Sequence, residues 1–196
     1  MKRLTSIAAL ITASLLFFAC GNNPQKRIVS ETPIKTEVLG LKLCDVTSER
    51  AIEKAISKAV DKMVVTDTQK NGVETVVRAF PMSFDINYGG LSWTYADVTL
   101  NEDKKIVQIS LVASYENIER AKEQYAAATR VFTQKYGQGN SNEEYQNIFW
   151  TDDTNSVGLT YVESSAVNGN DRSFCTLYYV NRELANALEE ANTPDI

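Results

Sequence analysis

The sequence predicts an α+β domain with a mainly antiparallel sheet backed by helices on one face. Stretches with apolar residues at spacings of three and four, typical of amphipathic helices, are followed by runs in which every second residue is apolar, typical of half-buried strands. These elements come in runs rather than in strict alternation, which favours α+β over α/β. A helix followed by a meander occurs twice, over residues 48–113 and 115–180. The repeat suggests two helix-plus-meander halves.

The domain is expected to begin with a strand and a helix. Alternating leucines predict a strand within residues 34–44. An alanine-rich apolar stripe at helical spacing predicts a helix over residues 48–62. Asp45 and Thr47 precede this helix and are candidate caps for its first turn.

Residues 64–115 are predicted to form an antiparallel meander. The Asn71-Gly72 pair tolerates positive φ and marks a turn. A hairpin is expected between residues 91–100 and residues 105–113, because apolar residues alternate in both runs around a polar turn. Alternation in the first of these strands places three large side chains on one face: Leu91, Trp93 and Tyr95.

The second half repeats the helix and the meander. A helix is predicted over residues 115–136, with Ser114 as its candidate cap and Gly137 at its end. A last helix, residues 182–191, follows a cap at Asn181. Between these helices the β-rich runs predict three strands: residues 148–150, 157–163 and 174–180.

The chain begins with the pattern of a secretory signal. Lys2 and Arg3 form a basic amino end, and an apolar run extends from Leu4 to Ala19. As a helix that run is about 24 Å long, shorter than the ~30 Å hydrocarbon core of a bilayer. Its length and its one-sided basic flank predict a signal peptide over residues 1–19 rather than a membrane span.

The end of the apolar run resembles the lipobox of bacterial lipoproteins. The residues are Leu16-Phe17-Phe18-Ala19, followed by Cys20 and Gly21. The resemblance implies cleavage after Ala19, a thioether-linked diacylglycerol on Cys20 and fatty acylation, for example with palmitate, of the new amine. Gly21 stands where many inner-membrane lipoproteins have aspartate, which implies an outer-membrane protein facing the periplasm. An ordinary signal peptide with an incidental cysteine is the alternative.

Residues 20–33 are predicted to be the lipidated Cys20 and a flexible tether, because the segment after Cys20 is polar, contains two prolines and lacks periodicity. Residues 34–196 are then expected to form a single domain. The 177 residues that follow Ala19 are enough for one hydrophobic core.

The composition excludes several functions. Removing Lys2 and Arg3 from the 20 basic residues leaves 18, against 25 acidic residues, so the net charge is −7. An acidic chain without a basic run repels phosphate backbones, so no nucleic-acid partner is expected. The chain has no histidine, which removes the commonest general base and the commonest neutral metal ligand.

Two cysteines remain after Cys20. Cys44 and Cys175 can form a disulfide in an oxidising compartment. Two buried free thiols are the alternative, and neither cysteine has the partners of a catalytic or metal-binding thiol.

No motif for catalysis, a metal or a cofactor is present. A serine hydrolase without histidine needs a lysine base, and neither Gly-x-Ser-x-Gly nor Ser-x-x-Lys occurs. The run Asp152-Asp153-Thr154-Asn155-Ser156 resembles half a calcium loop, yet it lacks the glycine and the distal glutamate, so we interpret it as an exposed turn. We therefore predict no metal, no cofactor and no enzymatic activity, with an enzyme that lacks a recognisable motif as an alternative.

The aromatic residues are the best candidates for recognition. Trp93 and Tyr95 lie on a predicted strand, and Trp150 precedes a turn. Tryptophan and tyrosine supply contact area at little cost in conformational entropy, so these three are candidate binding residues. Core packing is the alternative, and we favour it for Trp93.

The element order resembles the doubled modules of β-lactamase-inhibitor-like proteins, and Leu39-Gly40-Leu41 before the first helix is similar to small outer-membrane assembly lipoproteins. Lys135-Tyr136-Gly137 at a helix end resembles short lipoproteins of gut-type anaerobes, a likeness that implies no activity. We expect a membrane-anchored lipoprotein with a non-catalytic binding or adaptor domain for another envelope component, an envelope protein being the expected partner. A small-ligand or glycan-binding lipoprotein is the alternative.

Overall fold

The computed structural model describes residues 28–82, 85–142, 146–164 and 172–193. The signal sequence, Cys20 and the first part of the predicted tether lie outside these ranges. In the part of the chain that is described, no helix combines the length and the apolar character needed to cross a bilayer.

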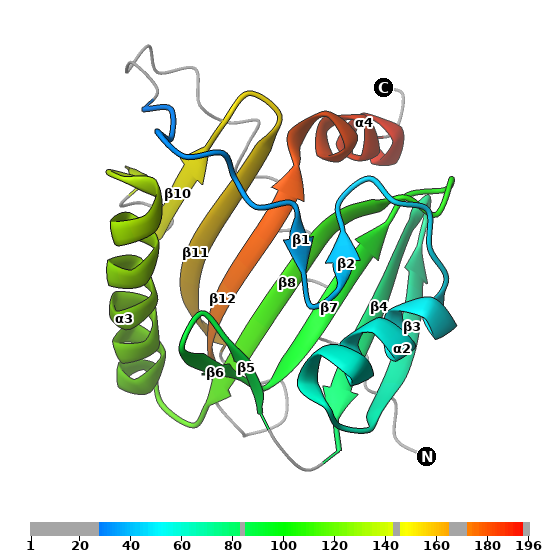
Figure 1. Cartoon of the computed structure of the whole chain (residues 1–196), viewed down its shortest axis with the longest axis horizontal. Helices are drawn as coiled ribbons and strands as arrows, with labels where there is room; N and C mark the ends of the chain where they lie inside the picture. Colours follow the sequence, from blue (N-terminus) through cyan, green and yellow to red (C-terminus); the bar gives the residue numbers. More distant parts are fainter. Residues whose placement is uncertain (1–27, 83–84, 143–145, 165–171, 194–196) are drawn as a thin grey trace.

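An eight-stranded antiparallel sheet is the framework of the domain (Figure 1). Its strand order is β3-β4-β7-β8-β12-β11-β10-β9, and three helices pack on it, which confirms the predicted α+β class. The strands are β3 (Val64–Asn71), β4 (Glu74–Pro81), β7 (Tyr95–Leu100), β8 (Ile106–Tyr115), β9 (Asn140–Asn142), β10 (Asn147–Thr151), β11 (Asn155–Ser164) and β12 (Arg172–Asn181).

The sheet consists of two halves with the same order of elements. In the first half α2 (Glu49–Val60) precedes β3, β4, β7 and β8, and in the second half α3 (Ile118–Tyr136) precedes β9 to β12. Within each half the strands run in chain order from the edge of the sheet to its centre. The halves meet where β8 pairs with β12, with Leu111 opposite Leu177. The two helix-plus-meander halves are therefore present.

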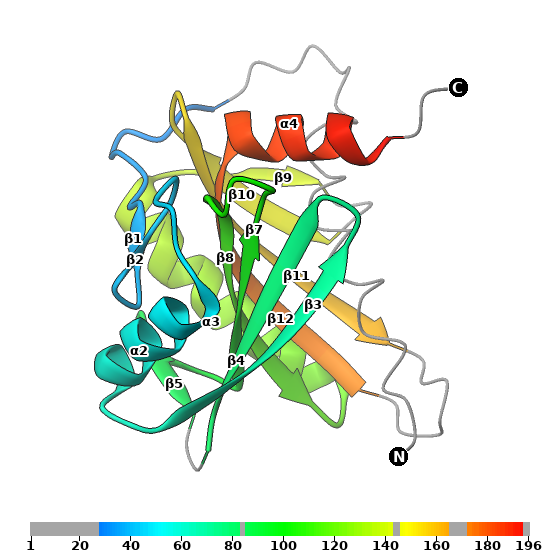
Figure 2. The ribbon, with the colours of Figure 1, turned by 90° about the vertical axis from the view of Figure 1, so that its right-hand side faces the viewer.

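The helices cover both faces of the sheet. α2 and α3 lie on one face, whereas α4 (Arg182–Asn192) crosses the other (Figure 2). Adjacent residues of β12 point to opposite faces, so Leu177 and Tyr179 join the large core while Tyr178 and Val180 pack against Ala185 of α4. The prediction that the helices back one face holds for α2 and α3 and is wrong for α4.

A small hairpin replaces the first predicted strand. β1 (Glu37–Val38) and β2 (Leu41–Lys42) pair with each other and not with the large sheet. The chain reverses at Leu39 and Gly40, whose φ values are 53° and 74°. The single strand predicted within residues 34–44 is therefore wrong, because glycine at this position permits a tight turn.

A second hairpin interrupts the predicted meander. β5 (Ile86–Tyr88) pairs with β6 (Leu91–Trp93), and Thr94 separates β6 from β7. The Thr94 N–H donates to the carbonyl of Val112 on β8 at 2.7 Å. The residue at which the strand breaks is therefore itself hydrogen-bonded to β8. The prediction of one continuous strand over residues 91–100 is therefore wrong.

Each of the three described helices begins directly after a polar capping residue. Ser48 caps α2, so the prediction of Asp45 or Thr47 as its cap is wrong, whereas Asn181 caps α4 as predicted. α3 begins at Ile118 with Asn117 as its cap, later than predicted, because Tyr115 still belongs to β8. Each capping oxygen accepts a backbone N–H that has no partner within the helix.

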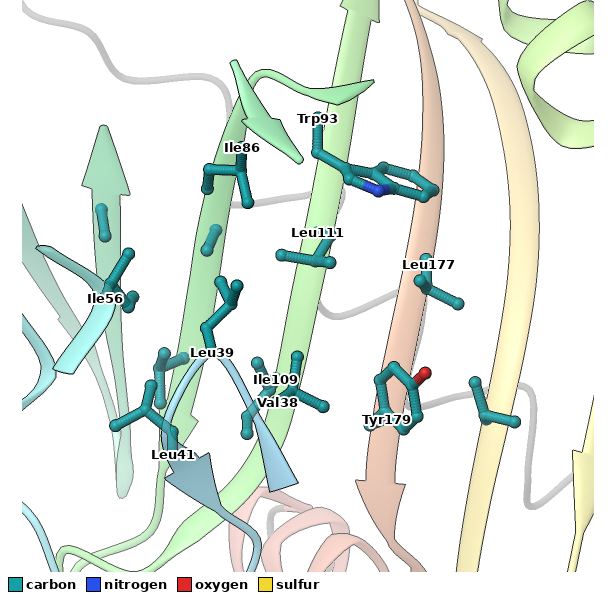
Figure 3. Close-up of a cluster of buried hydrophobic side chains, with 14 of the residues drawn as sticks. Val38, Leu39, Leu41, Ile56, Ile86, Trp93, Ile109, Leu111, Leu177 and Tyr179 are labelled. Carbon is teal, nitrogen blue, oxygen red and sulfur yellow. The ribbon is translucent and has the colours of Figure 1, made fainter. Parts of the chain in front are cut away.

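The main core lies between the sheet and the layer formed by α2, α3 and the two hairpins. Figure 3 shows how this layer is built: side chains of the β1–β2 hairpin and of α2, such as Leu41 and Ile56, lie over the sheet, and Trp93 from β6 lies beside Leu177. Phe132 of α3 packs against three aromatic rings at centroid distances of 5.8–6.4 Å: Tyr136, Trp150 and Tyr179.

Candidate functional site

The two tryptophans predicted as binding residues are core residues. Trp93 is 0% exposed and Trp150 is 1% exposed. The indole N–H of Trp93 donates to the Tyr88 carbonyl at 3.1 Å, and that of Trp150 donates to the Gly137 carbonyl at 2.8 Å. Both rings are buried and both polar atoms are bonded, so neither can form a recognition surface. The prediction that they bind a ligand is not supported, whereas the core alternative favoured for Trp93 agrees with its burial.

Tyr95 lies on the opposite face of the sheet from Trp93. The break at Thr94 places Tyr95 on β7 beside Phe80 of β4, with ring centroids 5.6 Å apart. The Arg78 guanidinium lies 4.5 Å from the centre of the Tyr95 ring, a cation–π contact. Burial raises the pKa of Tyr95 to about 12, so the phenol stays neutral at physiological pH.

The face that carries α4 also carries a continuous set of polar side chains from β4 to β10. Strand register places Asp97 opposite both Arg78 and Ser110, and Asn147 opposite Thr160. We refer to eight side chains as the polar face: Arg78, Asp97, Gln108, Ser110, Asn147, Ser156, Thr160 and Tyr178. All eight are buried.

A bidentate ion pair forms the β4–β7 end of the polar face. Arg78 Nε and Nη2 donate to the two carboxylate oxygens of Asp97, both at 2.7 Å. Burial alone would lower the pKa of Arg78, but the hydrogen bonds and charge of Asp97 hold that pKa above its ordinary value. The paired geometry satisfies both charges, which a buried site requires.

Four oxygens on the polar face have no hydrogen-bond partner among the described residues. Gln108 donates its amide N–H to Ser110 Oγ at 2.7 Å, and its own Oε1 accepts nothing. The other three are Asn147 Oδ1, Ser156 Oγ and Thr160 Oγ1. Buried polar atoms in folded proteins are nearly always paired, so four such oxygens on one face of one sheet mark a place where ordered water or another molecule would donate hydrogen bonds.

Tyr178 divides the polar face. A Cβ on Gly158 would collide with the hydroxyl end of the Tyr178 ring, which therefore lies over Gly158 of β11. Gln108, Ser110 and the ion pair lie on one side of this ring, and Ser156, Thr160 and Asn147 lie on the other. The glycine is required here because the phenol approaches the backbone of the neighbouring strand.

A separate cavity of about 440 Å³ lies beside the start of α2. Val77 and Leu100 form its apolar floor, and Lys70 and Lys104 lie at its rim with the acidic Glu49 and Glu102. The rim charges are of both signs, and the side chains of all four are exposed. The cavity is open and has no buried unpaired polar atom in its lining.

The two cysteines are free thiols, so the disulfide allowed by the sequence is not formed. The Cys44 N–H bonds the Ile106 carbonyl at the start of β8, whereas Cys175 pairs with Ala113 near its end. Seven residues of β8 separate these points, about 23 Å along a strand, and a disulfide needs Cα atoms within about 7 Å. Burial raises the pKa of the Cys175 thiol, and burial together with Asp45 and Glu183 raises that of Cys44.

The predicted turn at Asp152 is confirmed. Asp152 Oδ1 accepts the N–H groups of Thr154 and Asn155 at 2.9 and 2.7 Å, so the carboxylate closes its own turn. Within the described ranges no group of three or more acidic or cysteine side chains is placed to bind a metal ion.

The polar face was missed from the sequence because its residues look like ordinary solvent-facing positions. Gln108 and Ser110 alternate with Ile109 and Leu111, which is the pattern of a strand with one solvent-facing side. A detectable signal was Gly158 within a β-rich run, since glycine in a strand often marks a close approach of another group. No family model, no curated protein and no solved structure gives a significant match to this chain.

Proposed function

We propose that this protein is a lipid-anchored, non-catalytic binding protein of the bacterial envelope, and that it holds a protein partner on the polar face. The observation that carries the proposal is the set of unpaired oxygens on Gln108, Asn147, Ser156 and Thr160. Each buried polar atom left unpaired destabilises a fold by roughly 1–3 kcal/mol. These atoms are buried, so a partner must displace the groups that cover them before it donates hydrogen bonds, and it then recovers part of that free energy as affinity.

The polar face adjoins three partly exposed side chains of β11 and β12. Val162, Phe174 and Thr176 lie on the same face and are half-buried. A partner seated on this side contacts two apolar side chains and a hydroxyl first, and Thr160, which pairs with Thr176 in the register, is the next residue inward. Apolar contacts beside hydrogen-bonding groups are typical of protein interfaces.

A protein partner is favoured over a glycan. The two indoles that could stack on sugar rings are buried in the core on the opposite face. Backbone and side-chain amides of a protein supply the N–H donors that the carbonyl oxygens of Gln108 and Asn147 need. The lipidated Cys20 would keep the domain at the membrane, where envelope proteins are concentrated.

The test places a photocrosslinking amino acid at Thr176 in the full-length protein in intact cells. We expect one defined protein adduct at Thr176 and none at Gln134, an exposed residue of α3 that serves as the matched control. Equal labelling at both positions, or no adduct at Thr176, would contradict the proposal. Cell fractionation of the Cys20→Ser variant tests the anchor separately, because an unlipidated chain should leave the membrane fraction.

Thr160→Val distinguishes recognition from packing. Valine has the shape of threonine without the hydroxyl, so the variant removes one unpaired oxygen and should be at least as stable as the wild type. The yield of the Thr176 adduct should nevertheless fall. An unchanged yield with unchanged stability would show that the hydroxyl does not contact the partner.

A further inference from the structure

We infer that residues 28–34 form a strap that holds the membrane anchor at one end of the sheet, so that the domain meets the bilayer in a defined orientation. The inference rests on the lipidation of Cys20 in the proposed function. It differs from the sequence-based expectation of a tether that stays flexible up to residue 33, because the described part of that segment is bonded to the domain.

The first contact of the strap is a clamp between Ile28 and Asn140 on β9. The Ile28 N–H donates to Asn140 Oδ1 at 2.9 Å, and Asn140 Nδ2 donates to the Ile28 carbonyl at 2.8 Å. One side-chain amide therefore satisfies both backbone groups of Ile28, as a neighbouring strand would.

The second contact joins Ser30 to the ends of β10 and α3. The Ser30 N–H donates to the Thr151 carbonyl at 2.8 Å, and Ser30 Oγ lies 3.2 Å from the Tyr136 carbonyl at the end of α3. The Tyr136 carbonyl has no partner within the helix, because the last carbonyls of an α-helix point beyond its end.

The third contact links the strap to α4 through the turn at Asp152. Asp152 Oδ2 accepts the Ile34 N–H at 2.7 Å, and the Ile34 side chain is 4% exposed. Arg182, the first residue of α4, donates to the carbonyl of the same Asp152 at 3.1 Å. Strap, turn and α4 are thus bonded to one residue.

These contacts place Ile28, from which the chain leads back to Cys20, at one end of the sheet. The strap, the turn after β10 and the start of α4 lie together at that end (Figure 1). Eight residues connect Cys20 to Ile28 and reach at most about 28 Å. Cys44 lies at the same end, bonded to the first residue of β8, whereas Met82 follows the last residue of β4 at the opposite end. The bilayer therefore faces the Cys44 end, and Met82 points away from it.

Fluorescence quenching tests the orientation in the full-length lipidated protein. The exposed Cys44 carries the dye in one sample, and Met82→Cys in a Cys44→Ser background carries it in the other. In phospholipid vesicles with nitroxide-labelled headgroups we expect stronger quenching at Cys44. Equal quenching, or stronger quenching at position 82, would overturn the inference.

Asn140 variants test the strap itself. Asn140→Ala should speed hydrogen exchange at the Ile28 amide by roughly 3- to 10-fold and reduce the quenching difference. Asn140→Asp keeps an acceptor for the Ile28 N–H and should retain most of the protection, while Gln134→Ala on α3 should change nothing. Unchanged exchange in Asn140→Ala would contradict the clamp.

The same exchange measurement on the full-length Cys20→Ser chain separates the strap from the anchor. Protection of Ile28 in that variant, together with a wild type that fails to float with vesicles, would leave the strap in place and reject lipidation. Loss of protection in both proteins would reject the strap. Flotation of the wild type with vesicles would then decide separately whether Cys20 is lipidated.

Discussion

The ring of Tyr178 occupies the space above Gly158 on the neighbouring strand. The two residues face each other in the register of β11 and β12, so this contact fixes where the phenol lies on the polar face. Tyr178 can take this position only because residue 158 has no side chain.

Gly158→Ala should destabilise the protein by about 1–3 kcal/mol, because the added methyl group displaces a packed ring. Urea unfolding followed by tryptophan fluorescence measures the change. In a Tyr178→Ala background the same substitution should be neutral or stabilising, since alanine is preferred to glycine in a strand by about 0.5–1 kcal/mol. A similar loss in both backgrounds would show that the ring is not the cause.

Arg78→Ala should be among the most damaging single changes on the polar face. It leaves Asp97 buried without its counter-ion, and breaking a buried pair in this way costs about 3–5 kcal/mol. The double variant Arg78→Leu/Asp97→Leu removes both charges and should lose less stability than Arg78→Ala. Urea midpoints compare the three proteins, and a double variant less stable than the single one would contradict this account.

Glu74 should make stability depend on pH. It is 3% exposed, no described residue forms an ion pair with it, and burial raises the pKa of its carboxyl above the ordinary 4.5. A raised pKa in the folded state means that, at pH values just above 4.5, the folded protein binds more protons than the unfolded chain. Its stability therefore falls as the pH rises through this range.

Glu74→Gln removes that titration. The variant should equal the wild type below about pH 4 and exceed it in stability at pH 7, once the wild-type carboxyl is ionised. Thermal unfolding between pH 3 and 8 measures the difference. A difference that is constant over this range would mean that the charge of Glu74 does not contribute.

The two thiols should react at very different rates. Cys44 is exposed and Cys175 is 0% exposed, so a thiol reagent such as Ellman's reagent should modify Cys44 in the native protein and Cys175 only after unfolding. Mass spectrometry of the modified protein identifies the site. Loss of both thiols under non-reducing conditions, restored by reductant, would instead indicate the disulfide.

Local patterns determined much of the fold. The stripes of α2 and α3, the cap at Asn181 and the turn at Asp152 follow from side chains within a few residues of one another. The two halves follow as well, because each contains a helix and a meander that recur along the chain. The cap and the turn are hydrogen bonds between neighbours in sequence, and the stripes are a local spacing of apolar residues. The sequence alone therefore predicts both.

Tertiary structure decided what lies over each face. Alternation shows that the two sides of β8 and β12 differ, but not that α4 crosses one of them or that Tyr178 approaches Gly158. The break at Thr94 depends on a bond to Val112, and the strap depends on Asn140, more than one hundred residues from Ile28. Such contacts join residues far apart in the chain, so the local periodicity carries no information about them.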